Sequence, residues 1–226
     1  MSREADGRND RKIGASAAGR KRGSAAAVRE PGGARGGPRI ALGVSGGIAA
    51  YKAAEVVRGL VKAGAEVHVI MTPGGRQFIT PLTLQTLSGQ PVITGQWDLS
   101  HGPDVQHITL ARELDLFLVA PATADILARL AHGIADDFLS TFYLAVTAPV
   151  AVAPAMNVWM WEHPATQANL AVLKSRGVNI IDPGAGDLAC GDEGIGRMAE
   201  PDDIVEAALS IAKKKLRGRL RAAASS

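Results

Sequence analysis

Several absences narrow what this 226-residue chain can be. Aromatic residues make up only 4% of it, and its single cysteine, Cys190, excludes a disulfide within the chain. One unpaired thiol is typical of a reducing compartment, so we expect a cytoplasmic protein. No apolar run approaches the length of a membrane span, and the first residues lack the apolar core of a secretory signal. We therefore expect no membrane partner.

Charge is distributed unevenly along the chain. The whole chain carries +3, but residues 1–38 carry +5 and residues 212–226 carry +6, which leaves −8 for residues 39–211. A nucleic-acid-binding domain would place basic residues on its folded surface, so we expect no specific nucleic-acid partner. The composition predicts a disordered basic tail over 1–38, a folded domain over 39–211 and a basic C-terminal tail over 212–226.

Apolar runs that are typical of strands alternate with helical patterns. This alternation predicts a single α/β domain: a doubly wound, Rossmann-like or flavodoxin-like parallel sheet with helices on both faces. In such sheets ligands bind beyond the carboxyl ends of the strands, and the polar and glycine-rich segments gather there. The expected strands cover 39–44, 66–71, 114–120, 150–153 and 178–181, and the expected helices cover 49–63, 123–132, 164–176 and 202–215, with a glycine-rich loop over 182–201.

The turn after the first strand, Gly43-Val-Ser-Gly46-Gly47-Ile-Ala, opens a helix. Backbone N–H groups and the helix dipole at such a turn suit a phosphate, although the turn could also merely pack closely. The spacing is not G-x-G-x-x-G, and the second strand ends in Met71-Thr72 with no acid to hold a ribose diol. A mononucleotide such as FMN is therefore favoured over a dinucleotide.

Asn157 follows the fourth strand between apolar neighbours, in Pro154-Ala-Met-Asn-Val-Trp-Met-Trp161. A buried amide needs hydrogen-bond partners. Asn157 is thus either the N-cap of a helical turn that begins at Val158 or a ligand-binding group, and the sequence does not separate the two.

Other polar candidates also have two interpretations. Thr123 and Asp125 either cap a helix or contact a ligand, and Asp136-Asp137 favours capping over a metal site because no further ligands have suitable spacing. Cys190, in a glycine-rich loop, is either an inert thiol or a proton donor on a lid. We predict no metal site.

Together these segments resemble the phosphopantothenoylcysteine decarboxylase family of flavin-containing cysteine decarboxylases, over about residues 39–211. The resemblance rests on five ordered matches, which are Gly-Val-Ser-Gly-Gly-Ile-Ala-Ala-Tyr-Lys (43–52), His107 in Gln-His-Ile, Ala-Pro-Ala-Thr-Ala-Asp (120–125), Pro-Ala-Met-Asn-x-x-Met-Trp (154–161) and Ala-Cys-Gly-Asp (189–192) with Gly-Arg-Met (196–198). The chain looks most similar to the coenzyme A biosynthesis branch.

The resemblance implies FMN-dependent decarboxylation of 4′-phosphopantothenoylcysteine to 4′-phosphopantetheine. In the family, the thiol is oxidised to a thioaldehyde, carbon dioxide leaves to give an enethiolate, and reduction yields the product thiol. It also implies a homo-oligomer of trimers or multiples of trimers, with the flavin at subunit interfaces. Many bacterial members carry a C-terminal ligase that this chain lacks, so a separate phosphopantothenate–cysteine ligase is an expected partner.

The matching positions carry the family's roles to this chain. The resemblance implies that His107 is the active-site base or electrostatic partner, that Asn157 holds the substrate, and that Cys190 donates a proton. Met156 and Arg197 are the other expected substrate contacts. The implied flavin-binding residues are Ser45, Gly46, Gly47, Ile48, Thr72, Thr123, Ala124, Asp125 and Ala155.

Two other functions fit the same residues. One is a peptidyl-cysteine decarboxylase of the same fold, although such relatives often lack Ala-Cys-Gly-Asp. The other is a non-catalytic, flavin-binding regulatory subunit, which would usually lose an active-site residue, whereas His107, Asn157 and Cys190 are all present. A prenyltransferase of related fold would leave the Asn and Cys elements without a role.

Overall fold

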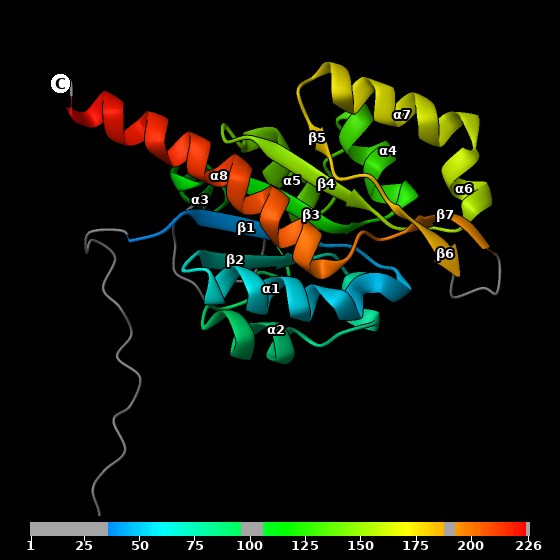
Figure 1. Cartoon of the computed structure of the whole chain (residues 1–226), viewed down its shortest axis with the longest axis horizontal. Coiled ribbons are helices and arrows are strands. Elements are labelled where there is room, and N and C mark those ends of the chain that lie inside the picture. Colours follow the sequence, from blue (N-terminus) through cyan, green and yellow to red (C-terminus); the bar gives the residue numbers. More distant parts are fainter. Residues whose placement is uncertain (1–35, 96–105, 188–192, 225–226) are drawn as a thin grey trace, which may run out of the picture. The chain divides into compact units, whose positions relative to one another are not determined.

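The computed structural model describes residues 36–95, 106–187 and 193–224. Five parallel strands form one sheet in the order β2-β1-β3-β4-β5 (Figure 1). This order, with helices on both faces, confirms the predicted flavodoxin-like, doubly wound fold. The strands are Arg39–Val44 (β1), Glu66–Met71 (β2), Leu116–Ala122 (β3), Val150–Pro154 (β4) and Asn179–Ile180 (β5).

The central strands are apolar because both of their faces are covered. Every residue of β3 is buried, and in β1 only Arg39 is partly exposed. Strands buried on both faces read as continuous apolar runs rather than as alternating ones. Their register aligns Ile40 of β1 with Val67 of β2 and with Leu116 of β3, so the strands end together at one edge.

Helices cover the sheet in two layers (Figure 1). One core cluster packs the sheet against α1 and α8, with α2 beside α1, and the other packs it against α3, α4, α5 and α7. The helices of the first layer are η1 (Ile48–Lys52), α1 (Ala53–Lys62), η2 (Gly75–Gln77), α2 (Pro81–Ser88) and α8 (Pro201–Ala224). The others are α3 (Gln106–Glu113), α4 (Ala124–His132), α5 (Phe138–Ala145), α6 (Val158–Glu162) and α7 (Pro164–Ser175).

The segment predicted as a glycine-rich loop instead contains an antiparallel hairpin. Its strands are β6 (Gly184–Asp187) and β7 (Glu193–Arg197). Gly196 has a φ of 148° and accepts a 2.9 Å backbone hydrogen bond from Met156. A Cβ at Gly196 would lie 2.4 Å from the carbonyl oxygen of Met156. Glycine at position 196 therefore permits close approach of the two backbones, whereas the sequence suggested only a mobile loop.

The last helix is longer than predicted. The sequence placed its end near Lys215, but α8 continues to Ala224 and passes through residue 212, where the basic tail was expected to begin. Lys, Arg, Leu and Ala are good helix formers, and Gly218 is the only weak one among the last twelve residues of the helix. Among the described residues, no helix is both long enough and apolar enough to cross a membrane.

Candidate functional site

A cavity of about 990 Å³ lies at the carboxyl ends of the strands. Each segment that the sequence singled out beyond β1, β2, β3 and β4 contributes to it, and β7 closes one side. Its size is at the upper end of the range for small-molecule sites. The predicted site residues that line it are Ser45, Gly46, Gly47, Ile48, Thr72, Thr123, Ala124, Asp125, Ala155, Met156, Asn157 and Arg197.

Ser45 joins the ends of β1 and β3, the point where the order of the strands reverses. Its hydroxyl donates a 2.8 Å hydrogen bond to the carbonyl of Pro121 and accepts a 3.2 Å bond from the backbone N–H of Thr123. The hydroxyl of Thr123 in turn accepts from Ile126 and caps α4, so the capping interpretation of Thr123 is confirmed. Ligands of doubly wound sheets bind at such reversal points.

The turn that contains Gly46 and the turn that contains Gly74 and Gly75 are in backbone contact beside the cavity. A Cβ at Gly46 would lie 2.7 Å from the carbonyl carbon of Gly74, and one at Gly75 would lie 2.5 Å from the carbonyl oxygen of Val44. Thr72 supports this contact because its hydroxyl accepts a 3.0 Å bond from the N–H of Gly75. Glycine is therefore required here for backbone contact, and the backbone itself faces the cavity.

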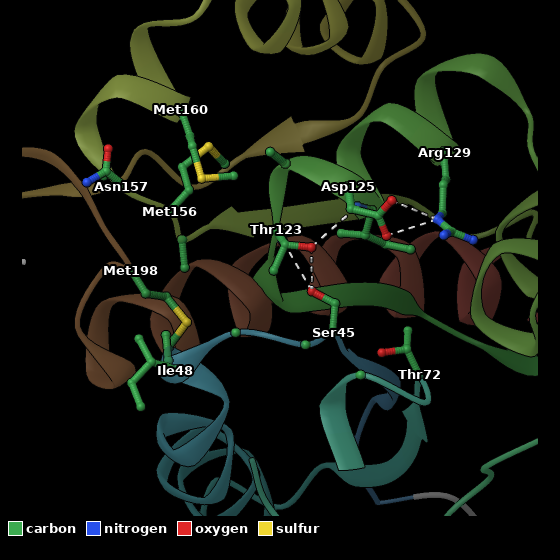
Figure 2. A pocket seen from close by; sticks show the side chains of 18 of the residues that line it. Ser45, Ile48, Thr72, Thr123, Asp125, Arg129, Met156, Asn157, Met160 and Met198 are labelled. Atoms are coloured by element: carbon green, nitrogen blue, oxygen red, sulfur yellow. Dashed lines mark hydrogen bonds and ion pairs between the residues drawn. The ribbon is translucent and has the colours of Figure 1, made fainter. Parts of the chain in front are cut away.

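The cavity has two chemically different sides (Figure 2). Ser45, Thr72, Thr123 and Asp125 give one side hydroxyl and carboxylate groups, whereas methionine and isoleucine side chains line the other. Thioether sulfur packs favourably against aromatic rings. The arrangement suits a ligand that combines a flat ring with a polar, hydroxyl-bearing chain. The apolar side is formed by Ile48, Met156, Met160 and Met198.

Asn157 caps a helix and also lines the cavity. Its side-chain oxygen accepts a 2.8 Å bond from the N–H of Trp159 and caps α6. The same residue also lines the cavity. The N-cap interpretation is therefore confirmed, and capping does not remove Asn157 from the site.

Two cationic side chains, Lys52 and Arg197, share one carboxylate next to the hairpin. Lys52 is buried and its ammonium lies 3.3 Å from Glu200, whose other oxygen lies 2.8 Å from the guanidinium of Arg197. Lys52 and Arg197 both line the cavity. A buried ammonium requires a counter-charge, which Glu200 supplies.

A second ion network borders the polar side. Arg129 pairs with Asp125 at 2.9 Å and with Asp136, and these two carboxylates, Asp136 first, raise the pKa of the guanidinium. Asp137 caps α5 through a reciprocal capping box with Ser140, which confirms the capping interpretation for Asp137, whereas Asp136 pairs with Arg129 instead. Among the described residues, no group of three metal-ligating side chains is present.

The other two predicted catalytic residues, His107 and Cys190, lie partly or wholly outside the described residues. His107 is the second residue of α3, and the position of its side chain lies outside the described part. Cys190 lies outside the described residues, between β6 and β7 in sequence. His68 pairs with Glu66, and His163 accepts a 3.2 Å bond from Ala165 at the start of α7.

Several cavity residues were not predicted from the sequence. Lys52 is one turn after Ile48 on the same helical segment, and that spacing could have indicated it. Met160 lies in α6, whereas Met156 lies before that helix, so helical spacing did not indicate Met160. Arg129 follows Asp125 by four residues on α4, so that spacing could also have indicated it, whereas its second partner, Asp136, depends on the return of the chain.

Comparison with known proteins identifies the family. The sequence model of the family described as Flavoprotein matches residues 28–213, most of the chain. The chain belongs to the flavoprotein family.

Curated relatives of this flavoprotein include the coenzyme A biosynthesis bifunctional protein CoaBC of Escherichia coli strain K12. It is 52% identical over 174 residues, which are 77% of this chain and 43% of the relative. The corresponding protein of Bacillus subtilis strain 168 is 50% identical over 169 residues, which are 75% of this chain and 42% of the relative. This flavoprotein therefore spans less than half the length of these relatives.

Solved structures of similar fold include a PPC decarboxylase variant complexed with pantothenoylaminoethenethiol. It is 35% identical, with a TM-score of 0.68, and the match covers 76% of this chain and 96% of that chain. SpaF, described as an FMN-dependent cysteine decarboxylase, is 30% identical with a TM-score of 0.67, covering 78% of this chain and 97% of that one. Peptidyl-cysteine decarboxylase EpiD, at 23% identity and a TM-score of 0.64, shares the fold.

Proposed function

We propose that this flavoprotein binds FMN and decarboxylates 4′-phosphopantothenoylcysteine to 4′-phosphopantetheine in coenzyme A biosynthesis. The observation that carries the proposal is the 35% identity to the PPC decarboxylase over nearly the whole of that chain. The similarity to the CoaBC proteins at 50–52% identity supports the same branch of the family.

The residues of the cavity fit FMN. The helical segment η1–α1 begins without any side-chain cap at Gly47 or Lys52, so its N-terminal amides and dipole are available to a phosphate. The hydroxyls of Ser45 and Thr123 suit a ribityl chain, and the thioethers suit an aromatic ring system. Bound FMN would supply a two-electron sink that accepts a hydride from the substrate and returns one.

In this proposal the residues of the chain orient the substrate. Asn157, fixed by its cap bond to α6, would hold the substrate carboxylate or amide at the edge of the apolar side, next to Met156. Arg197 would attract an anionic group of the substrate into the cavity. The methionine side would exclude water from the departing carboxylate, which favours loss of charge as carbon dioxide leaves.

Two residues would transfer protons in the proposed reaction. His107 would act as the base or electrostatic partner during oxidation and decarboxylation, because imidazole exchanges protons near neutral pH. Cys190 would donate the proton to the enethiolate carbon in the reductive half. Its place between β6 and β7 supports this role, since β7 borders the cavity through Gly196 and Arg197.

Large exposed apolar side chains line the cavity or lie next to a lining residue in α6. Ile48, Tyr51, Trp159 and Met160 are each about half exposed or more, with Trp159 at 70%. Exposed apolar clusters on this scale are typical of interaction surfaces. We propose that a second copy of the chain covers them in a homo-oligomer, a trimer or a multiple of trimers, in which His107 serves a neighbouring cavity.

The remaining assignments follow from the same reasoning. We propose a decarboxylase domain over residues 39–211 between basic segments at 1–38 and 212–226, in a cytoplasmic protein. We also propose a phosphopantothenate–cysteine ligase as a partner, since the similar CoaBC proteins are described as bifunctional.

The absorbance spectrum and the turnover of the purified chain test the proposal together. We expect oxidised-flavin bands and conversion of 4′-phosphopantothenoylcysteine, followed by mass spectrometry as the loss of carbon dioxide. A colourless protein that FMN does not reconstitute would overturn the cofactor. Turnover of only a cysteine-terminated peptide would indicate a peptidyl-cysteine decarboxylase, and a yellow oligomer without turnover would indicate a regulatory subunit.

A further inference from the structure

Asp115 is a fully buried carboxylate at the amino edge of the sheet, far from the groups described above. It lies in the short connection between α3 and β3. One oxygen accepts a 2.9 Å bond from the backbone N–H of Arg39, at the start of β1. The side-chain charge is met from α8, because Arg219 lies 3.1 Å from the other oxygen. A buried carboxylate without such a counter-charge would be strongly unfavourable.

Arg219 also binds the end of α3. Its guanidinium donates a 3.2 Å hydrogen bond to the carbonyl of Glu113, the last residue of that helix. The last carbonyls of a helix lack intrahelical partners, and a cation there opposes the helix dipole. One side chain therefore closes the C-terminus of α3 and neutralises the carboxylate that follows it.

The contact between α3 and α8 depends on this group because the two helices do not pack closely there. A cavity of about 390 Å³ separates them, lined by Arg112, Glu113, Leu216, Arg219 and Leu220. Arg39 holds the side chain of Glu113 from β1. Arg219 is the residue that fixes the backbone of α3 from the α8 side.

The helix α3 also carries His107, near its N-terminus. Glu113 lies six positions after His107, which is about 9 Å along a helix axis. We propose that Arg219 is a positioning residue that holds α3, and with it His107, in the orientation that decarboxylation requires. The inference rests on the proposed function, and it gives the basic C-terminal segment a role in the reaction.

Arg219→Ala in the FMN-loaded protein is the first test, with Arg217→Ala as the matched control. Arg217 is an exposed arginine on the same helix, two residues away. We expect hydrogen exchange of the α3 amides to become roughly tenfold faster in Arg219→Ala and to stay at the wild-type rate in the control. We also expect kcat to fall roughly tenfold with KM nearly unchanged, because a displaced base weakens only the transition state.

A second variant separates positioning from stability. Arg219→Ala with Asp115→Asn removes the uncompensated charge, and the asparagine oxygen still accepts the bond from Arg39. We expect this double variant to recover most of the melting temperature while α3 exchange stays fast and kcat stays low. Recovery of kcat together with the melting temperature, or unchanged α3 exchange in Arg219→Ala, would overturn the proposal.

The exchange measurement also separates this inference from the proposed function. If the wild-type protein does not turn over 4′-phosphopantothenoylcysteine, the proposed function fails, and with it the link to His107. Slow α3 exchange that depends on Arg219 would then remain as a property of the fold, and fast exchange in the wild type would refute that part as well.

Discussion

The hydroxyl of Ser45 donates to the carbonyl of Pro121 over 2.8 Å and thereby joins the turn after β1 to the end of β3. Ser45 is almost completely buried, and it also accepts from the N–H of Thr123. The strand order reverses between these two strands, so this one side chain links the segments after β1 and β3 that line the cavity.

Replacement of Ser45 by alanine leaves the partly buried N–H of Thr123 without its partner, and the carbonyl of Pro121 keeps only the longer 3.4 Å bond from the backbone N–H at position 45. We expect Ser45→Ala to lower the free energy of unfolding by about 1–3 kcal/mol and to weaken FMN binding, measured by urea denaturation and by flavin fluorescence. Ser175→Ala is the control, because its exposed hydroxyl bonds only to the local carbonyl of Val172. Equal stability of the two variants would contradict the role of the Ser45 hydroxyl in joining the ends of β1 and β3.

A methyl group at Gly46 would collide with the backbone of Gly74. Backbone atoms cannot change rotamer as a flexible side chain can, so the turns at Gly46 and Gly74 would have to move apart. We expect Gly46→Ala to fold but to lose most of its FMN on gel filtration, which the ratio of flavin to protein absorbance measures. Gly95→Ala is the matched control because nothing lies within 4 Å of its Cβ position, and it should retain the cofactor.

Aspartate caps a helix as well as asparagine does, so Asn157→Asp preserves the bond to Trp159. The added negative charge would repel the substrate carboxylate. We therefore expect an unchanged melting temperature with a fall in kcat of roughly 100-fold or more, measured by release of carbon dioxide. Asn169→Asp, a half-buried asparagine of α7 outside the cavity lining, should keep full activity. A fully active Asn157→Asp enzyme would refute the substrate contact.

The hydrogen bond from His68, together with Arg39, lowers the pKa of Glu66 from 4.5 to about 2. Because the folded pKa is below the unfolded one, ionised Glu66 stabilises the fold above about pH 4.5, and this contribution is lost as the pH falls towards 2. We expect Glu66→Gln to be less stable than the wild type by roughly 1 kcal/mol at pH 7, since solvent screens the partly exposed pair. The difference should vanish between pH 4.5 and 2, as urea unfolding at each pH would show.

The matched control for Glu66→Gln is Glu55→Gln, at an exposed glutamate of α1. A difference from the wild type that stays constant from pH 7 to 2 would contradict the assignment of the effect to ionised Glu66.

The sequence predicted the sheet well because its signals are local. β1 and β2 begin and end at the predicted residues, since each is an apolar run bounded by turn residues. The site followed from topology, because parallel strands bring segments such as Ser45 and Asn157 to one edge.

What the sequence did not predict depends on contacts between distant residues. Lys52 meets Glu200 across 148 positions, and Arg219 meets Asp115 across 104. Neither pair is marked by any local pattern. The hairpin was missed for a related reason: the glycines of β7 serve a close approach to the segment after β4, which only the folded chain brings near.

The cavity takes its walls from the ends of four strands and from the hairpin, so no fragment of the chain contains a complete binding site. A ligand that needs all of these walls binds the folded state alone and stabilises it in proportion to the logarithm of its concentration. Bound flavin should therefore raise the melting temperature, and global unfolding should release it. The rise of the melting temperature with FMN concentration would then measure how tightly the assembled cavity holds the cofactor.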